Sequence, residues 1–174
     1  MIVSVGPLVT AAANNICLSQ TPLVAGNLTI NGAAATVGVA TLDTQRQVLF
    51  TFAGNESART FVVYGTKQGG STIQESVAGT ASTAVTNQNF LTVTQISVDD
   101  ATAAALTVGT NGVGATDWQS VDLMREPINL SFQVVVSDTL NYTAQYTNDD
   151  IQNLAVGTYP TVFNHVTIVA QTTS

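Results

Sequence analysis

The chain has one lysine, one histidine and one cysteine among its 174 residues, and only 9% of its residues are charged. An average soluble protein has roughly 25% charged residues. Histidine, lysine and cysteine are the side chains that most often serve as bases, nucleophiles and metal ligands. Their scarcity disfavours an enzyme and predicts a structural or binding protein.

Other absences narrow the class further. A lone cysteine, Cys17, excludes an intrachain disulfide. The four cations, Arg46, Arg59, Lys67 and Arg125, leave a net charge of −7, which opposes binding to phosphate backbones. No apolar run approaches the roughly 18 residues of a membrane-spanning helix, and the N-terminus has no basic start typical of a secretion signal. We therefore expect neither nucleic acid nor a membrane as a direct partner.

Residues that favour β-strands dominate instead, with 27 threonines and 23 valines. Short runs of them recur between Gly, Asn, Asp and Ser along most of the chain, as in sandwiches and barrels. We predict an all-β, single-domain antiparallel β-sandwich, of jelly-roll or immunoglobulin-like type, over residues 21–174. Residues 1–20, rich in Ala and Asn and without clear periodicity, are predicted to form an N-terminal arm or an edge segment of the sheet.

Alternation identifies the strands. Val48, Phe50 and Phe52 share one face of the segment 47–52, which predicts a half-buried strand. The segment 59–65 is predicted to be the second strand of a hairpin with it. Further strands are predicted over 36–42, 71–78, 90–98, 104–108, 130–136, 142–146 and 162–170.

Glycines mark the expected turns. Asn31-Gly32 favours a tight turn with positive φ, and Gly69-Gly70 predicts a second turn. The glycine-rich segment 109–117 is predicted to be a mobile loop or turn. Glu75 falls on the more apolar face of its strand, which predicts an edge position or a bonding partner for its carboxylate.

Two reactive side chains are candidates for chemistry. His165 would need a nucleophile and an orienting group to act as a base, and no G-x-S-x-G motif occurs. Cys17 lies among apolar residues, where a small buried thiol is the expected role. We predict that both are structural, with an interface contact as the other role open to His165.

Carboxylates offer two further alternatives, hydrolysis and calcium binding. No spacing pairs two of them across a groove as a glycosidase requires. The Asp99-Asp100 and Asp149-Asp150 pairs lie at predicted strand ends, where calcium is the alternative to a solvated turn, but the EF-hand pattern is absent. We predict no catalytic residue, no metal site and no cofactor. The carboxylates considered are Glu56, Glu75, Asp99, Asp100, Asp149 and Asp150.

A series of turn and strand motifs from residue 19 onward resembles tailed-bacteriophage virion proteins. It comprises the segments SQTP at 19–22, AGNLTING at 25–32, AGNES at 53–57, RTF at 59–61 and GT at 65–66, then Glu75, Val77 and Gly79, and finally NYT at 141–143 and TVFNH at 161–165. The sequence departs from the pattern at Phe52, Ala58 and Tyr64, where smaller or more polar residues are usual. The motifs carry no catalytic residues.

The resemblance implies a capsid decoration, or cement, protein on the outer surface of the phage head, made in the host cytoplasm. Its partners would be the major capsid protein and further copies of itself, with a trimer favoured and a dimer as the alternative. The arm over residues 1–20 would reach a neighbouring subunit.

Two alternatives stay open from the sequence. The first is a tail, neck or fibre-base protein of the same virion. The second is a carbohydrate-binding module that uses exposed aromatic side chains. The aromatic candidates are Tyr64, Trp118, Tyr142 and Tyr159.

Overall fold

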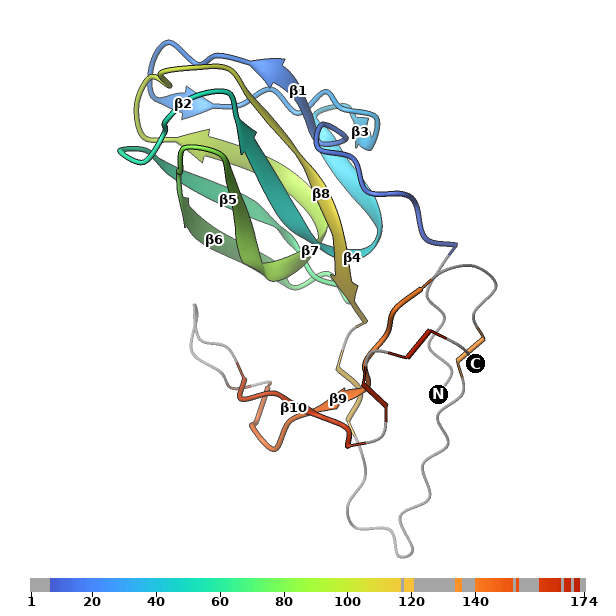
Figure 1. Cartoon of the computed structure of the whole chain (residues 1–174). Coiled ribbons are helices and arrows are strands. Elements are labelled where there is room, and N and C mark those ends of the chain that lie inside the picture. Colours follow the sequence, from blue (N-terminus) through green and yellow to red (C-terminus); the bar gives the residue numbers. More distant parts are fainter. Residues whose placement is uncertain are drawn as a thin grey trace, which may run out of the picture. The chain divides into compact units, whose positions relative to one another are not determined.

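The structure is a computed structural model that describes residues 7–116, 118–120, 134–135, 140–151, 153, 160–166, 168–169 and 171–172. It is all-β over these residues and confirms the predicted antiparallel β-sandwich. The chain divides into two compact units, Met1–Gln119 and Ser120–Ser174, where the sequence predicts one domain with an arm. The sandwich belongs to the first unit (Figure 1).

The first unit contains eight strands in one antiparallel sheet, whose main path runs β1-β8-β4-β7-β5-β6. The short strands β2 and β3 pair with β7 and β4. The bounds are β1 Cys17–Gln20, β2 Gly26–Asn27, β3 Ala35–Thr36, β4 Val39–Phe52, β5 Thr60–Thr66, β6 Thr72–Ala78, β7 Thr83–Val98 and β8 Leu106–Ala115.

One sheet makes a sandwich because its two longest strands bend. β4 and β7 pair at one end through Ala40 and Val93 and at the other through Phe50 and Ala84, with register shifts between. Such irregularities bend a strand and increase its twist. The first half of β4 and the second half of β7 lie in one layer with β5 and β6, and the remaining halves lie in the other layer with β8 and β1.

The core lies between these layers. The rings of Phe50 on β4 and Phe61 on β5 are 5.1 Å apart, although β7 separates the two strands in the sheet, so the contact crosses the sandwich. Phe52 packs against both rings. The predicted inward face of 47–52 is confirmed, since Val48, Phe50 and Phe52 are all buried. Burying an aromatic side chain contributes roughly 2–3 kcal/mol, so this cluster is a main source of stability.

The predicted hairpin between 47–52 and 59–65 is wrong. Both strands exist, but β4 pairs with β7 and β8, whereas β5 pairs with β6 and β7. Both edges of the 47–52 part of β4 are occupied by β7 and β8, which come later in the chain, so β5 has no edge there to bind. Gly69 and Gly70, by contrast, have positive φ in the β5–β6 turn, as predicted.

The tight turn expected at Asn31-Gly32 lies elsewhere. Neither residue has positive φ; Gly32 instead allows the backbone of Asn15 to approach, because an added Cβ would lie 2.3 Å from Asn15 C. Val37 and Gly38, with φ of 51° and 76°, form a two-residue turn between paired Thr36 and Val39. Positive φ at both central positions is typical of a type I′ turn, which favours Asn-Gly.

Val37 is therefore strained, since a β-branched residue rarely adopts positive φ. Its side chain is 99% exposed, so no packing within the described chain offsets the strain. We expect Val37→Asn to raise the free energy of unfolding by about 1 kcal/mol, measured by urea denaturation. The control is Val24→Asn, an exposed valine whose φ is not positive. An equal gain in both variants would mean that loss of an exposed valine, and not the turn, is responsible.

The predicted N-terminal arm is partly built into the sandwich. Cys17–Gln20 form β1, and Ile16 and Cys17 are completely buried in the core. The prediction of a mobile loop or turn over 109–117 is wrong as far as Ala115, because β8 continues to that residue. Gly109 faces the N-terminal segment, since an added Cβ would lie 1.9 Å from Ala12 O. Its missing side chain thus allows a close backbone approach.

An ion pair holds the start of the described chain. The Arg46 guanidinium donates to Asp43 at 2.6 and 2.7 Å and to Val9 O at 2.8 Å, while Val9 N donates to the same carboxylate at 2.6 Å. Burial raises the pKa of Asp43, but the bonds from Arg46 and Val9 outweigh it and lower the pKa overall. The bond to Asp43 likewise raises the pKa of Arg46, so the pair stays ionised and binds both backbone groups of Val9.

The second unit contains two short strands, β9 Gln145–Tyr146 and β10 Phe163–Asn164, which pair with each other. They lie within the predicted strands 142–146 and 162–170 but are much shorter. The predicted strand 130–136 lies outside the described residues except for 134–135, which are not in a strand. Over the part of the chain that the structure describes, no helix is long and apolar enough to cross a membrane.

Candidate functional site

The two reactive side chains belong to different units, Cys17 to the first and His165 to the second. Cys17 is buried in the core, where desolvation raises the pKa of its thiol to about 12, so it is protonated at neutral pH. The prediction that it is a small buried hydrophobic residue is confirmed. His165 is exposed beside β10, and its backbone N–H donates to Ala144 O at 2.9 Å.

The two glutamates of the sandwich bind backbone groups. Glu56 accepts from the N–H groups of Ala103 and Ala104 at 3.1 and 2.8 Å. Glu75 accepts from Asn87 and Gln88 at 2.7 and 2.8 Å. Glu75 lies on β6 at the end of the sheet path and has these partners, so both alternatives predicted for it hold.

The aspartate pairs predicted as solvated turns or calcium sites are exposed. Asp99, Asp100, Asp149 and Asp150 all lie outside strands. Asp100 accepts from the N–H of Ala101, and Asp149 accepts from the N–H of Thr161. Within the described ranges no three His, Cys, Asp or Glu residues gather as metal ligands would.

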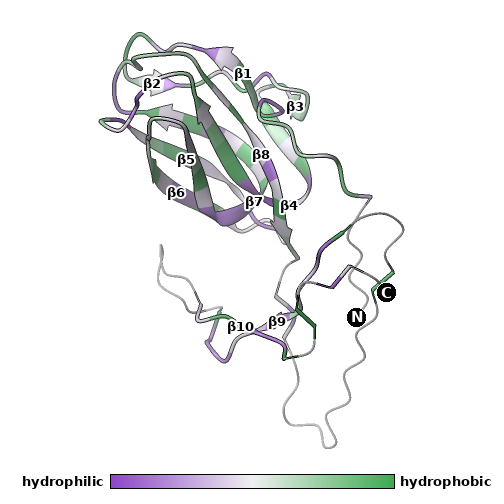
Figure 2. Cartoon of the chain, viewed as in Figure 1, coloured by the Kyte–Doolittle hydropathy of each residue, from purple (hydrophilic) through white to green (hydrophobic). Residues whose placement is uncertain are grey.

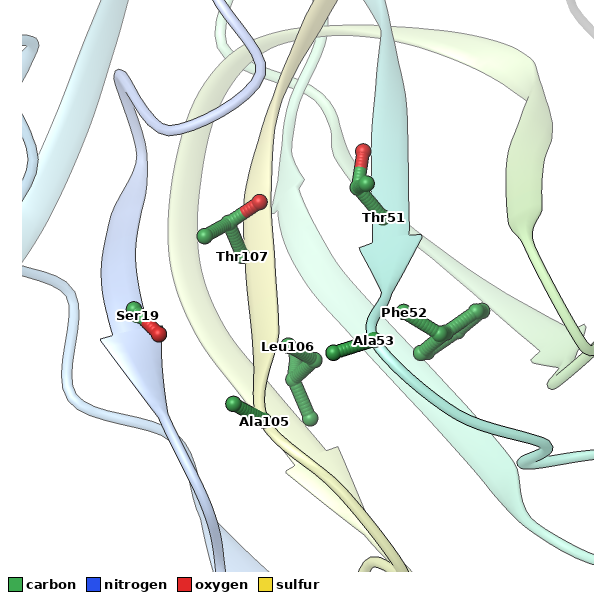
Figure 3. Close-up of a pocket in the computed structure, with 7 residues that line it drawn as sticks. All are labelled: Ser19, Thr51, Phe52, Ala53, Ala105, Leu106 and Thr107. Carbon is green, nitrogen blue, oxygen red and sulfur yellow. The ribbon is translucent and has the colours of Figure 1, made fainter.

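One small depression lies on the outer side of the sandwich, with a volume of about 150 Å³. Figure 3 shows hydroxyl-bearing side chains from three strands among its lining residues, those of Ser19, Thr107 and Thr51. Ligand pockets are typically about 300–1,000 Å³ and carry convergent polar groups. This depression is smaller and has no titratable side chain, so it does not resemble an active site. Its lining is completed by Phe52, Ala53, Ala105 and Leu106.

The most unusual surface is the outer face of the layer that contains β5, β6 and the second half of β7. Along β5 and β6, buried residues alternate with residues that point outward, and along β7 the alternation is interrupted at Thr94 and Gln95. Figure 2 shows the strands of the sandwich banded with hydrophobic and hydrophilic residues. Asp43, on the first half of β4 in the same layer, is charged and pairs with Arg46, but none of the outward residues of β5, β6 and the second half of β7 is charged. We call them the neutral face: Thr60, Val62, Tyr64, Thr66, Thr72, Gln74, Ser76, Ala78, Thr92, Thr94, Gln95 and Ser97.

A row of threonines crosses one end of the neutral face. Strand register places Thr92 beside Thr66, and Thr66 beside Thr72. Thr41 of β4 extends the row on the other side of Thr92. The hydroxyls of Thr66 and Thr92 are 2.7 Å apart and share a hydrogen bond. The row thus presents hydroxyl and methyl groups without a charge.

Charged residues of these strands are directed elsewhere. Glu75 points inward to β7, and Arg59, Lys67 and Asp99 lie just beyond the strand ends. Burying a charge at an interface costs several kcal/mol unless it finds a partner, whereas hydroxyl and amide groups can exchange hydrogen bonds with a partner's surface. The neutral face is therefore suited to contact with another protein.

The sequence indicates the low charge of this surface but not its location. Which outward residues share a face depends on the register of β5, β6 and β7, and β7 begins seven residues earlier than predicted. Of the aromatic candidates for carbohydrate binding, Tyr64 lies on the neutral face. Tyr142 belongs to the second unit, and Tyr159 lies outside the described residues.

The chain was compared with protein-family models, curated proteins and solved structures. No model of a protein family, no curated protein and no solved structure matches it. The resemblance to tailed-phage virion proteins therefore stays a prediction from the sequence.

Proposed function

We propose that the chain is a decoration protein of a tailed-phage head, which binds the outer surface of the major capsid protein through the neutral face. The observation that carries the proposal is the absence of any charged side chain among the twelve outward residues of β5, β6 and the second half of β7. The motif resemblance supplies the virion as the setting.

Decoration stabilises a shell by binding and not by catalysis. A stable contact buries roughly 800 Å² on each partner, and repetition over the shell adds avidity. A protein that binds only the mature lattice stabilises it by mass action. Few ions need to be desolvated at the neutral face, so the contacts do not depend on compensating charge pairs.

A charge in the middle of the neutral face tests the proposal. The test uses expanded heads that were assembled without the protein. Val62→Glu should bind these heads at least tenfold more weakly than the unmodified chain, a loss of about 1.4 kcal/mol in binding free energy, because the carboxylate would be buried without a partner. Occupancy is measured by quantitative gel analysis of purified heads after incubation with the chain. The control is Val85→Glu, which puts the same charge on an exposed outward valine of the other layer.

Failure of the unmodified chain to bind such heads would overturn the proposal. Equal occupancy by both variants would exclude the neutral face as the contact. The alternative tail, neck or fibre-base location predicts about a dozen or fewer copies per particle, whereas decoration predicts hundreds in a ratio fixed by the lattice. Copy number in purified virions distinguishes the two.

A further inference from the structure

Sheet edges are sites of association because their backbone groups lack a strand partner. At the β1 end of the sheet, side chains and loop backbone close the edge. Leu18 N–H donates to the Asn31 side chain at 2.9 Å, and Ile16 O accepts from the backbones of Asn31 and Gly32. β2 and β3 have only two residues each, and very short strands offer little to pair with.

β6 forms the other end of the sheet and is open. It pairs with β5 without a register shift over seven residues. The terminal bonds, Lys67 N to Ser71 O and Gly79 N to Arg59 O, show that odd-numbered residues bond to β5. The N–H and C=O groups of Thr72, Gln74, Ser76 and Ala78 therefore point away from β5. No described strand pairs with them.

The outward side chains of this edge do not protect it. Natural edges are commonly blocked by an outward Lys, by Pro, by a bulge or by an inward-pointing charge, and of these β6 has only the last, in Glu75. Its one charged residue, Glu75, is turned inward and bonded to Asn87 and Gln88. One outward group is occupied, since the Gln88 side-chain amide donates to Gln74 O at 2.9 Å. A side-chain bond of this kind can be released when a strand approaches.

We propose that β6 pairs antiparallel with β6 of a second copy of this chain, forming a two-fold dimer with one sheet layer continuous across both sandwiches. A two-fold pair needs only one edge, and β6, at one end of the sheet path, offers seven residues in unbroken register, whereas β1 at the other end has four. A strand paired with itself also places like residues close together, which only an uncharged edge tolerates.

The register of the β6–β6 pair follows from the backbone N–H and C=O groups that point away from β5. Pairing centred on Ser76 sets this residue opposite its own copy and Gln74 opposite Ala78 of the other copy, so outward N–H and C=O groups meet. It also keeps Glu75 away from the second Glu75, which a pairing centred on residue 75 would not. Of the two oligomers expected from the sequence, this edge favours the dimer. The proposal goes beyond capsid binding, because it concerns the chain's contact with itself.

Charges at the two-fold axis provide the test. The full-length chain should sediment as a dimer, and Ser76→Lys and Ser76→Glu should each raise the dimer dissociation constant at least 100-fold, because like charges would face each other. An equimolar mixture of the two variants should dimerise again. Ser82→Lys, at an exposed serine outside the strands, is the control and should stay dimeric.

Analytical ultracentrifugation over a range of concentrations measures the oligomeric state of each variant. Thermal unfolding checks that the variants fold, which we expect because Ser76 is exposed. A wild-type monomer at all concentrations overturns the proposal. So does a dimer that neither charge disrupts, or a mixture that does not reassociate. No phage head enters the experiment, so its outcome is separate from that of the decoration test.

Discussion

Glu56→Leu should lower the free energy of unfolding by about 3 kcal/mol, because hydrogen bonds to a charged acceptor contribute roughly 1.5–3 kcal/mol each. The Glu56 carboxylate, 1% exposed, accepts from the N–H groups of Ala103 and Ala104. Leucine has a similar volume, so little of the loss comes from a cavity. Stabilities of small proteins are only about 5–15 kcal/mol, so the change is easily measured by urea denaturation.

Two controls separate the hydrogen bonds from the charge. Glu56→Gln keeps one acceptor oxygen and should lose less stability than Glu56→Leu. Asp99→Asn removes a negative charge from an exposed side chain and should change stability by less than about 0.5 kcal/mol. If Glu56→Leu behaved like Asp99→Asn, water would be replacing the carboxylate at both N–H groups.

The carboxylate of Glu56 is one of several charged groups of the first unit that bond to its own backbone. Glu75 binds two successive N–H groups at the bend of β7, as Glu56 does in the loop before β8. The side chains of Arg46 and Asp43, which are 5% and 13% exposed respectively, both bond to the backbone of Val9. Charges of these strands and loops thus serve internal contacts. This placement leaves the outward residues of β5, β6 and the second half of β7 without a charge.

Local patterns made some of the fold predictable. The alternation of 47–52 identifies β4 and its inward face because the side-chain period of a strand is two, whatever the strand pairs with. Gly69-Gly70 identifies its turn for a similar reason, since glycine has no steric barrier to positive φ. Both signals depend only on neighbouring residues.

Strand partners were not predictable in this way. The loop between β4 and β5 is short enough for a hairpin, yet β4 binds strands that begin at Thr83 and Leu106. Glycine is equally ambiguous, because it permits both turns and close backbone approach. Gly109 has the second role, and the sequence does not reveal that Ala12 lies against it. The neutral face depends on the same long-range register.

The second large loss of stability is expected from a substitution at the bend of β7. A register shift between Gln47 and Leu49 interrupts the pairing of β4 with β7, and the Thr86 hydroxyl accepts from Val48 N at 2.9 Å. The same hydroxyl donates to Gln88 O at 2.8 Å and is buried. One side chain thus satisfies a donor and an acceptor at the point where the sheet passes between layers.

Thr86→Val should therefore lower the free energy of unfolding by about 2 kcal/mol, because valine has the same shape but leaves the buried Val48 N–H without an acceptor. Urea denaturation measures the loss. Thr83→Val, on the outward and exposed face of the same strand, is the matched control and should be within about 0.5 kcal/mol of the wild type. Equal losses in the two variants would mean that the Thr86 hydroxyl does not stabilise the bend, and that packing of β4 on β7 alone joins the layers.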